Sequence, residues 1–339
     1  MRRGIRVLMG ALCIAGVLAA PVSPVHAQKA PVEAIEIRSR PITQFRMGSA
    51  ETRFGPLEFV GGLEMRSRSR HFGALSSFRF LSPGRDFIGV ADTGFWFFGR
   101  VERDEAGRPA GIADFTMQQM VDRRGNIIND KGLTDAEALA VRDGVATVGF
   151  ERDHRISEFA VDPSDMKGPL RNVDFLVPAH ELRRNRGFET ITFAHPHGIH
   201  EGARIAITEK SLDRAGNIFA AIIEGRARGV FTIARRGEFD ITDGVTLENG
   251  DLLLLERSYS VARGVGMRLR RIYGESVTKG MVADGPILYE ADMSYQIDNM
   301  EGMDVWRRDD GALVVALISD DNHSILQRNL YLEFILHGD

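Results

Sequence analysis

NMEGMDVWRRDDGALVVALISD, residues 299–320, decides the fold, because the same phrase returns four more times with variations. Each copy opens on an acidic or small residue and has two apolar runs joined by a glycine-containing turn, the second ending on an acidic residue. The other copies are GALSSFRFLSPGRDFIGVAD (73–92), DAEALAVRDGVATVGFE (135–151), GFETITFAHPHGIHEGARIAITE (187–209) and TDGVTLENGDLLLLE (242–256). If Ser76, Glu137, Glu189, Asp243 and Glu301 are equivalent, the copies are 61, 52, 54 and 58 residues apart. Repeats of about 40–60 residues built only from short strands are typical of a β-propeller.

The turns between the apolar runs predict an all-β fold of about five blades, or six if residues 35–65 build a further one. Asn249-Gly250 and Asp310-Gly311 are typical of tight hairpins, and no sustained helical periodicity is present. We expect four strands in each blade. The last copy supplies three, at 301–307, 312–319 and 325–336, so a strand at 57–65 is expected to complete that sheet. N- and C-terminal strands sharing one blade would close the ring.

The first 27 residues read as a secretory signal. Three arginines precede an apolar stretch from Leu8 to Ala20, and Val25-His26-Ala27 is a small-x-Ala cleavage site. We expect cleavage after Ala27 and a periplasmic or secreted protein. Ordinary secretion is favoured over twin-arginine export. The mature chain is expected to have a flexible N-terminus at 28–34 and a single domain over 35–339.

Composition excludes several classes of protein. The only cysteine, Cys13, lies in the signal, so disulfides, thiolate catalysis and cysteine-ligated metals are excluded from the mature chain. Without the signal, 40 basic residues face 47 acidic ones, which argues against non-specific nucleic-acid binding. No apolar run in the mature chain approaches the roughly 18 residues of a membrane span. We expect a monomer.

Acidic residues recur at the two ends of the inner apolar runs. A propeller brings equivalent strand ends to one mouth, and Ca²⁺ binds about six to eight oxygen ligands. The sequence therefore predicts a calcium site there. The alternative is that these acids cap strands, bond loop amides or lie in water. The candidate ligands are Asp92, Glu137, Glu151, Glu189, Glu209, Asp243, Glu256, Glu301 and Asp320.

Basic residues and histidines accompany the strand-end acids. Arg152, Lys210 and Arg257 each follow such an acid directly and are candidates for phosphate binding, because cations pair with phosphate oxygens. Surface ion pairs are the alternative. His154 and His323 each lie three residues after a strand-end acid and are candidate acid/base groups. The histidines between 195 and 200 fit a hairpin loop better than a zinc site.

The motifs also resemble those of a known family. Phe72-Gly-Ala-Leu-Ser-Ser77, Asp135-Ala-Glu-Ala-Leu139, Arg186-Gly-Phe-Glu189, Asp243-Gly with Leu254-Leu-Glu-Arg257, and Asp298-Asn-Met-Glu-Gly302 with Ser319-Asp-Asp-Asn-His323 stand in the same order. They resemble the phytase-like family, "esterase-like activity of phytase", over residues 57–337. The resemblance implies a secreted or periplasmic β-propeller with phosphoesterase or esterase activity. Calcium-dependent propeller phytases have an acidic mouth similar in kind to the one predicted here.

Three functions are consistent with these expectations. The first is metal-assisted hydrolysis of phosphoric esters, with Ca²⁺ as cofactor and a small phosphorylated substrate. The second is a non-catalytic propeller that binds a periplasmic ligand or protein partner. The third is a metal-dependent lactonase or carboxylesterase.

Overall fold

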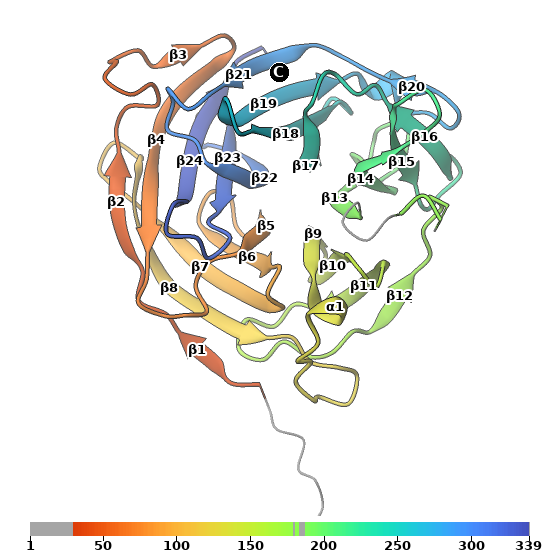
Figure 1. Cartoon of the computed structure of the whole chain (residues 1–339), viewed down its shortest axis with the longest axis horizontal. Coiled ribbons are helices and arrows are strands. Elements are labelled where there is room, and N and C mark those ends of the chain that lie inside the picture. The colour runs from red at the N-terminus through yellow and green to blue at the C-terminus, as the bar shows by residue number, and fades with distance from the viewer. Residues whose placement is uncertain (1–29, 179, 183–186, 339) are drawn as a thin grey trace, which may run out of the picture.

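The computed structural model describes residues 30–178, 180–182 and 187–338, and shows five β-sheets arranged as blades around a centre (Figure 1). The predicted signal at 1–27 lies outside the described residues. Short segments supplement the sheets, namely helix α1 (Lys131–Thr134) and a 3₁₀ turn at Gly274–Ser276. No helix in the described ranges is long and apolar enough to cross a bilayer.

The inner strands of each blade form an antiparallel meander that begins at the centre and runs outward. The first contains β5 (Leu75–Phe80), β6 (Asp86–Ala91), β7 (Phe95–Arg103), β8 (Pro109–Gln119) and β1 (Val32–Ala34). The second contains β9 (Ala136–Arg142), β10 (Val145–Phe150), β11 (Arg155–Ala160) and β12 (Arg171–Val173). The third contains β13 (Phe188–Phe193), β14 (Arg204–Leu212), β15 (Ile218–Ile222), β16 (Gly229–Ile233) and β20 (Val282–Ala283), the last of which pairs in parallel with β16.

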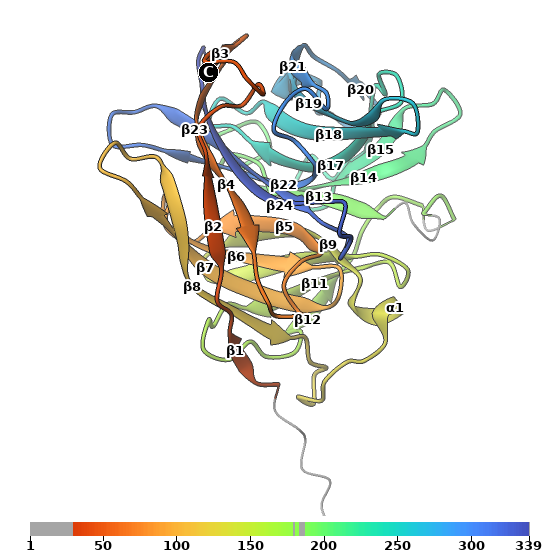
Figure 2. The same ribbon diagram turned by 60° about the vertical axis from the view of Figure 1, so that its left-hand side comes forward.

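The fourth and fifth blades follow the same plan. The fourth contains β17 (Asp240–Thr246), β18 (Leu252–Ser260), β19 (Gly264–Ile272) and β21 (Ile287–Ala291). The fifth contains β22 (Asn299–Arg307), β23 (Leu313–Asp320), β24 (Asn329–Leu336), β4 (Leu57–Arg66) and β2 (Arg38–Ile42), with β3 (Arg53–Phe54) beside β4. The strand predicted near 57–65 is β4. It runs antiparallel to β24, which lies beside it (Figure 2).

Two expectations about the blades need correction. The blades are not all four-stranded, because β1, β20, β2 and β3 add to exposed sheet edges that would otherwise leave backbone groups unpaired. Residues 35–65 build no sixth blade, since their strands join the fifth sheet. Part of the segment expected to be flexible, residues 32–34, forms β1 and pairs with β8.

Apolar side chains fill the interfaces between neighbouring blades. The strands are apolar on both faces, as the sequence LLLL at 252–255 illustrates, because a blade packs against a neighbour on each side. Leu254 packs with blade three while Leu253 packs with blade five. A further cluster joins blade five to blade one and contains Leu63, Tyr331 and Phe78. The innermost strands β5, β9, β13, β17 and β22 contact one another in turn around the centre (Figure 1).

Candidate functional site

An acidic cavity of about 530 Å³ lies at the starts of the innermost strands. All five blades contribute to its wall. Eight carboxyl groups and four cationic side chains line it, so the cavity carries an excess of negative charge when all are ionised. The lining residues are Ser76, Asp92, Lys131, Asp135, Glu137, Glu151, Arg152, Glu189, Glu209, Lys210, Arg257, Glu301, Asp320 and Asn322.

A β-bulge in each innermost strand sets the first layer of this wall. The strand register skips one residue in every blade, and the extra residue is left unpaired in the ladder. The bulged residues are Ser76, Glu137, Glu189, Thr242 and Glu301. Four of the five line the cavity, and three of these are glutamates.

The ends of the second strands form a second layer. The backbone N–H groups of Asp92, Glu151 and Glu209 donate to the carbonyls of Ala74, Asp135 and Gly187, two residues before each bulge. In the last two blades, Arg257 pairs with Asp240, and Asp320 pairs with Asn299. Asp240 and Asn299 also lie two residues before the bulged residue of their strand. The equivalent positions are therefore Asp92, Glu151, Glu209, Arg257 and Asp320, with an arginine in blade four where the others have an acid.

The fourth copy of the repeat is thus shifted by one residue from the alignment predicted by the sequence. Its bulged residue is Thr242 rather than Asp243, and its strand-end residue is Arg257 rather than Glu256. Because successive strand residues point to opposite sides, a shift of one residue moves a side chain out of the cavity. Asp243 and Glu256 do not line the cavity, whereas the other seven predicted acids do.

Buried arginines pair with these two acids. Glu256 lies 3.1 Å from Arg268 Nη1 and 2.5 Å from Arg270 Nη2. The Asp243 carboxylate accepts two hydrogen bonds of 2.8 Å from Arg79 and lies fully buried. Arg79 comes from blade one and also donates to the carbonyl of Met303 in blade five at 2.7 Å. This ion pair therefore bridges blades one, four and five behind the bulged residues.

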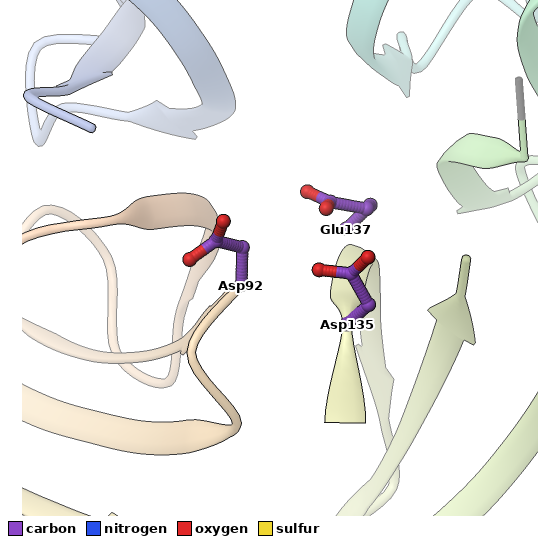
Figure 3. A group of neighbouring side chains, drawn as sticks. All are labelled: Asp92, Asp135 and Glu137. Carbon is purple, nitrogen blue, oxygen red and sulfur yellow. The ribbon is translucent and has the colours of Figure 1, made fainter. Parts of the chain in front are cut away.

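Three carboxyl groups come close enough to share a cation. Oxygens of Asp92, Asp135 and Glu137 all lie within 4.8 Å of one another (Figure 3). Lys131 Nζ lies 2.8 Å from Asp92 Oδ2 and 3.7 Å from Asp135 Oδ1. Burial lowers the pKa of Lys131, but the hydrogen bond and charge of Asp92 outweigh this and leave the pKa raised. Arg152 Nε lies 2.5 Å from Asp135 Oδ2 as well, so the protein already places two positive charges beside this group.

Two glutamates in the first layer have no contacting cation or hydrogen-bond donor within the described ranges that would stabilise their charge. Neither Glu137 nor Glu189 has a hydrogen-bond or ion-pair partner among the described residues. Burial, followed by repulsion from Glu151, raises the pKa of Glu137 well above its usual value. The pKa of Glu189 is raised in the same way by burial and then by Glu137 and Glu209. These carboxylates would gain from a bound cation.

Three further carboxyl groups of the cavity have raised pKa values. Burial raises the pKa of Glu151 to about 7, although the Gly187 N–H donates to its carboxylate at 2.6 Å and opposes the shift. Burial raises the pKa of Glu301 to about 7 against the opposing charge of Arg257. Asp320 has a pKa of about 8, from burial and then from the charge of Glu301.

Gly187 explains one of the sequence motifs. A Cβ atom at this position would meet Glu151 Cγ at 2.8 Å, so only glycine lets the backbone approach that carboxyl group. The Gly-Phe-Glu sequence at the start of β13 therefore has two roles. Gly187 allows the close backbone contact, and Glu189 is the bulge residue whose carboxyl group lines the cavity.

The three cations predicted from the sequence all reach the cavity. Arg152 Nε donates to Asp135 Oδ2 at 2.5 Å. Lys210 Nζ donates to Asp240 Oδ2 at 2.6 Å, and Arg257 Nη1 lies 3.1 Å from Glu301 Oε1. Arg257 comes from blade four and Lys210 from blade three, whereas the three close carboxyl groups come from blades one and two.

The comparisons with known proteins place this site in a family. A family model described as "Phytase-like: Esterase-like activity of phytase" matches residues 70–323. The chain belongs to this family. The match to the phytase-like family includes all the carboxyl groups and cations that line the cavity. No curated protein matches the chain.

Solved structures give only distant matches. A putative glucose dehydrogenase-type oxidoreductase from a Thermus species is 10% identical, with a TM-score of 0.41, and the match covers 81% of this chain and 99% of that one. An endo-arabinase from Bacteroides thetaiotaomicron is 14% identical, with a TM-score of 0.40 and coverages of 74% and 94%. A thermostable family-43 glycoside hydrolase is 11% identical, with a TM-score of 0.44 and coverages of 77% and 89%.

The two histidines predicted for acid/base chemistry do not line the cavity of this phytase-like chain. His154 lies on the turn between β10 and β11, beside Gly187. His323 is exposed on the loop between β23 and β24 and lines a separate cavity with Phe72 and Asp321. A catalytic role for either imidazole stays a prediction.

Sequence reasoning missed several residues of the cavity. Asp135 lies two residues before Glu137, and this i, i+2 spacing places both on one side of a strand, which was a usable signal. Lys131 precedes the repeat and reaches the cavity from α1, which no strand pattern predicts. Ser76 was recognised as equivalent to the glutamates, but not as part of the cavity wall.

Proposed function

We propose that this phytase-like chain is a secreted hydrolase that cleaves phosphoric esters in the acidic cavity with the help of a divalent cation, most simply Ca²⁺. The family match supports a phytase-like hydrolase, and the cavity supports the choice of chemistry. The observation that carries the proposal is the convergence of Asp92, Asp135 and Glu137 in a cavity that Arg257 and Lys210 also line.

The donor atoms fit calcium. All acidic ligands offered by the cavity are carboxylate oxygens, which hard cations prefer, and the mature sequence has no cysteine to favour a soft metal. Asp92 Oδ1 is buried and has no hydrogen-bond partner among the described residues, which leaves one oxygen free for a cation. Asp92, Asp135 and Glu137 would hold the ion. When bound, it supplies positive charge that polarises a phosphoryl oxygen and acidifies water.

Two cations from blades three and four are suited to hold the phosphoryl group. Arg257 is pre-positioned by Glu301 at 3.1 Å and by Glu209 at 3.6 Å, so its planar guanidinium can pair with two oxygens without a large loss of side-chain freedom. Lys210 adds a second positive charge beside it, because it lies 3.5 Å from Glu209. These residues orient the ester in the cavity.

A carboxyl group with a raised pKa is suited to donate a proton to the leaving alcohol. Asp320, with a pKa of about 8, is largely protonated near neutral pH and lines the cavity. Glu151, with a pKa of about 7, is a second such group in the cavity wall. Proton donation by these carboxyl groups needs no imidazole in the wall.

Phosphate release by the mature protein tests this proposal. The protein is stripped with EDTA and assayed on p-nitrophenyl phosphate, phytate, a lactone and a carboxylic ester, with and without added Ca²⁺. We expect calcium-stimulated phosphate release that falls about 100-fold in Glu137→Gln. Glu105→Gln, on the exposed turn between β7 and β8, is the matched control and should be unaffected.

Other outcomes would favour the alternatives. Hydrolysis of lactones or carboxylic esters without phosphate release would select an esterase or lactonase. If no substrate is turned over with Ca²⁺, Mg²⁺, Mn²⁺ or Zn²⁺, a non-catalytic binding propeller replaces the proposal.

A further inference from the structure

Lys131 contacts two of the three carboxyl groups that would hold the cation. Its Nζ lies 2.8 Å from Asp92 Oδ2 and 3.7 Å from Asp135 Oδ1. Asp92 follows β6 in blade one and Asp135 precedes β9 in blade two, so the ammonium group bridges the two blades. The same two carboxyl groups converge with Glu137, and the three side chains point toward one another (Figure 3). Lys131 and a metal ion would therefore use the same oxygens.

The local charge balance favours the loss of one cationic contact when a divalent ion binds. Three ionised carboxyl groups carry three negative charges, and Lys131 and Arg152 supply two positive ones. A divalent ion bound beside both cations would leave this group with an excess of positive charge. The ion and an ammonium group held by the same oxygens would also repel each other strongly, because they lie only a few ångströms apart. Release of one cation restores neutrality.

Lys131 is the cation that can leave. Its side chain is 47% exposed and ends in a compact charge on a flexible stem, so rotation alone can withdraw it. The backbone of α1 stays fixed, because the Asp130 side chain accepts from the Gly132 N–H at 2.8 Å and the Asp153 N–H donates to the Gly132 carbonyl at 3.3 Å. A withdrawn ammonium group therefore remains tethered at the cavity wall that Lys131 lines.

We propose that Lys131 occupies the cation site in the calcium-free protein and that calcium displaces its ammonium group into the cavity, where it joins Arg257 and Lys210 in binding the phosphoryl group. This inference rests on the proposed function, which supplies both the ion and the ester. Binding of the ion thus makes a cation that neutralised the carboxyl groups available to the substrate.

Amine labelling measures the displacement directly and needs no turnover. Reductive methylation modifies the neutral, accessible amine, and peptide mass spectrometry gives a separate rate for each lysine. The chain after residue 27 has only five lysines, which makes the peptides easy to distinguish. We expect saturating Ca²⁺ to raise the rate at Lys131 at least about fivefold, because the amine loses two anionic partners. Lys167, which pairs with Asp165 and does not line the cavity, is the internal control and should keep its rate.

Calorimetry and kinetics on one variant give a second test. Lys131→Met should bind Ca²⁺ at least about tenfold more tightly, because calcium no longer has to displace an ammonium group. Arg152→Met is the matched control, since it removes a positive charge from the same carboxyl group of Asp135 but leaves Lys131 in place, and it should gain less. At saturating calcium, Lys131→Met should raise KM for p-nitrophenyl phosphate about threefold or more. Tighter calcium binding together with weaker substrate binding is a pattern that misfolding does not produce.

The outcomes separate this inference from the proposed function. Faster labelling of Lys131 in calcium, together with no hydrolysis of any ester, would support the displacement and overturn the proposed function. Calcium-stimulated phosphate release with a Lys131 labelling rate that calcium leaves unchanged would overturn the inference and leave the proposed function standing. Equal calcium affinities in Lys131→Met and Arg152→Met would also overturn it, and an unaltered KM in Lys131→Met would overturn the assignment of Lys131 to the substrate.

Discussion

The substitution Asp243→Asn tests whether Asp243 is a buried structural residue, as the strand register of the structure places it, or a cavity ligand, as the sequence spacing suggests. The spacing makes Asp243 a calcium ligand, whereas the structure pairs it with Arg79 behind the bulged residues. Its carboxylate also accepts hydrogen bonds from the N–H groups of Gly244 at 2.7 Å and Met303 at 2.9 Å, and from Ser77 Oγ at 3.1 Å. Within the described part of the chain, Asp243 is the only acid that bonds the Arg79 guanidinium through both carboxylate oxygens. Replacing Asp243 removes this contact.

The expected cost follows from burial. Arg79 is 6% exposed and Asp243 is fully buried, so the substitution leaves a buried guanidinium without the carboxylate that bonds it directly, and only the charge of Asp304 still acts on it. Breaking a buried ion pair in this way costs about 3–5 kcal/mol of unfolding free energy. Whole domains are stable by only about 5–15 kcal/mol, so the loss is easily measured. Arg79→Met in the same chain should recover part of it, because the unpaired charge is then absent.

The assay combines urea unfolding in EDTA with calcium calorimetry. We expect Asp243→Asn to lose about 3–5 kcal/mol of stability while binding Ca²⁺ with unchanged affinity below its unfolding transition. The opposite pattern would refute the reasoning. If stability stayed within about 0.5 kcal/mol of the original and calcium binding disappeared, Asp243 would be a ligand and the structural register would be wrong.

Three further predictions concern the acidic cavity. Without calcium, the folded pKa values of about 7 for Glu151 and Glu301 and about 8 for Asp320 lie above those of the unfolded chain, so their contribution to stability is full near pH 4 and falls as the pH rises through 7 to 8. Melting temperatures in EDTA between pH 4.5 and 8.5 check this, and a rise with pH would contradict it. Glu137→Gln should stabilise the calcium-free protein at pH 8, because it removes a buried carboxyl group that has no partner among the described residues, and should abolish the stabilisation by calcium. A calcium-dependent increase of melting temperature retained in this variant would count against Glu137 as a ligand. Arg257→Gln should raise KM for p-nitrophenyl phosphate about tenfold or more, since it removes a bidentate cation from the cavity. A change confined to kcat, with KM unaltered, would argue against a role in substrate binding.

The repeated phrase predicted the blades well because it carries local information. Apolar runs, Gly-containing turns and the orphan strand at 57–65 are properties of neighbouring residues, and they correspond to the five sheets and to the pairing of β4 with β24. The additional edge strands were not predictable in this way. β1 has only three residues and β20 only two, and both depend on a sheet edge supplied by distant residues.

The site was predicted less completely, since a bulge changes which residues face inward without changing the letters around it. In the fourth copy, Thr242-Asp243 gives two polar candidates for one position, and the sequence favours the acid. In the pairing of β17 with β18, Thr242 is the unpaired bulge residue, and the Asp243 side chain contacts Arg79. The same shift converts the strand-end position from Glu256 to Arg257. The contacts that Lys131 makes with Asp92 and Asp135 depend on packing between blades one and two, which periodicity does not reveal.

The position of a calcium ion in a crystal of the mature protein tests the central claim most directly. Crystals grown in Ca²⁺, with a lanthanide soak to provide an anomalous signal, would locate the ion. The account predicts an ion in the acidic cavity with ligands from Asp92, Asp135 and Glu137. A crystal saturated with calcium in which these three carboxyl groups hold only water or Lys131, and the cavity holds no ion, would contradict it.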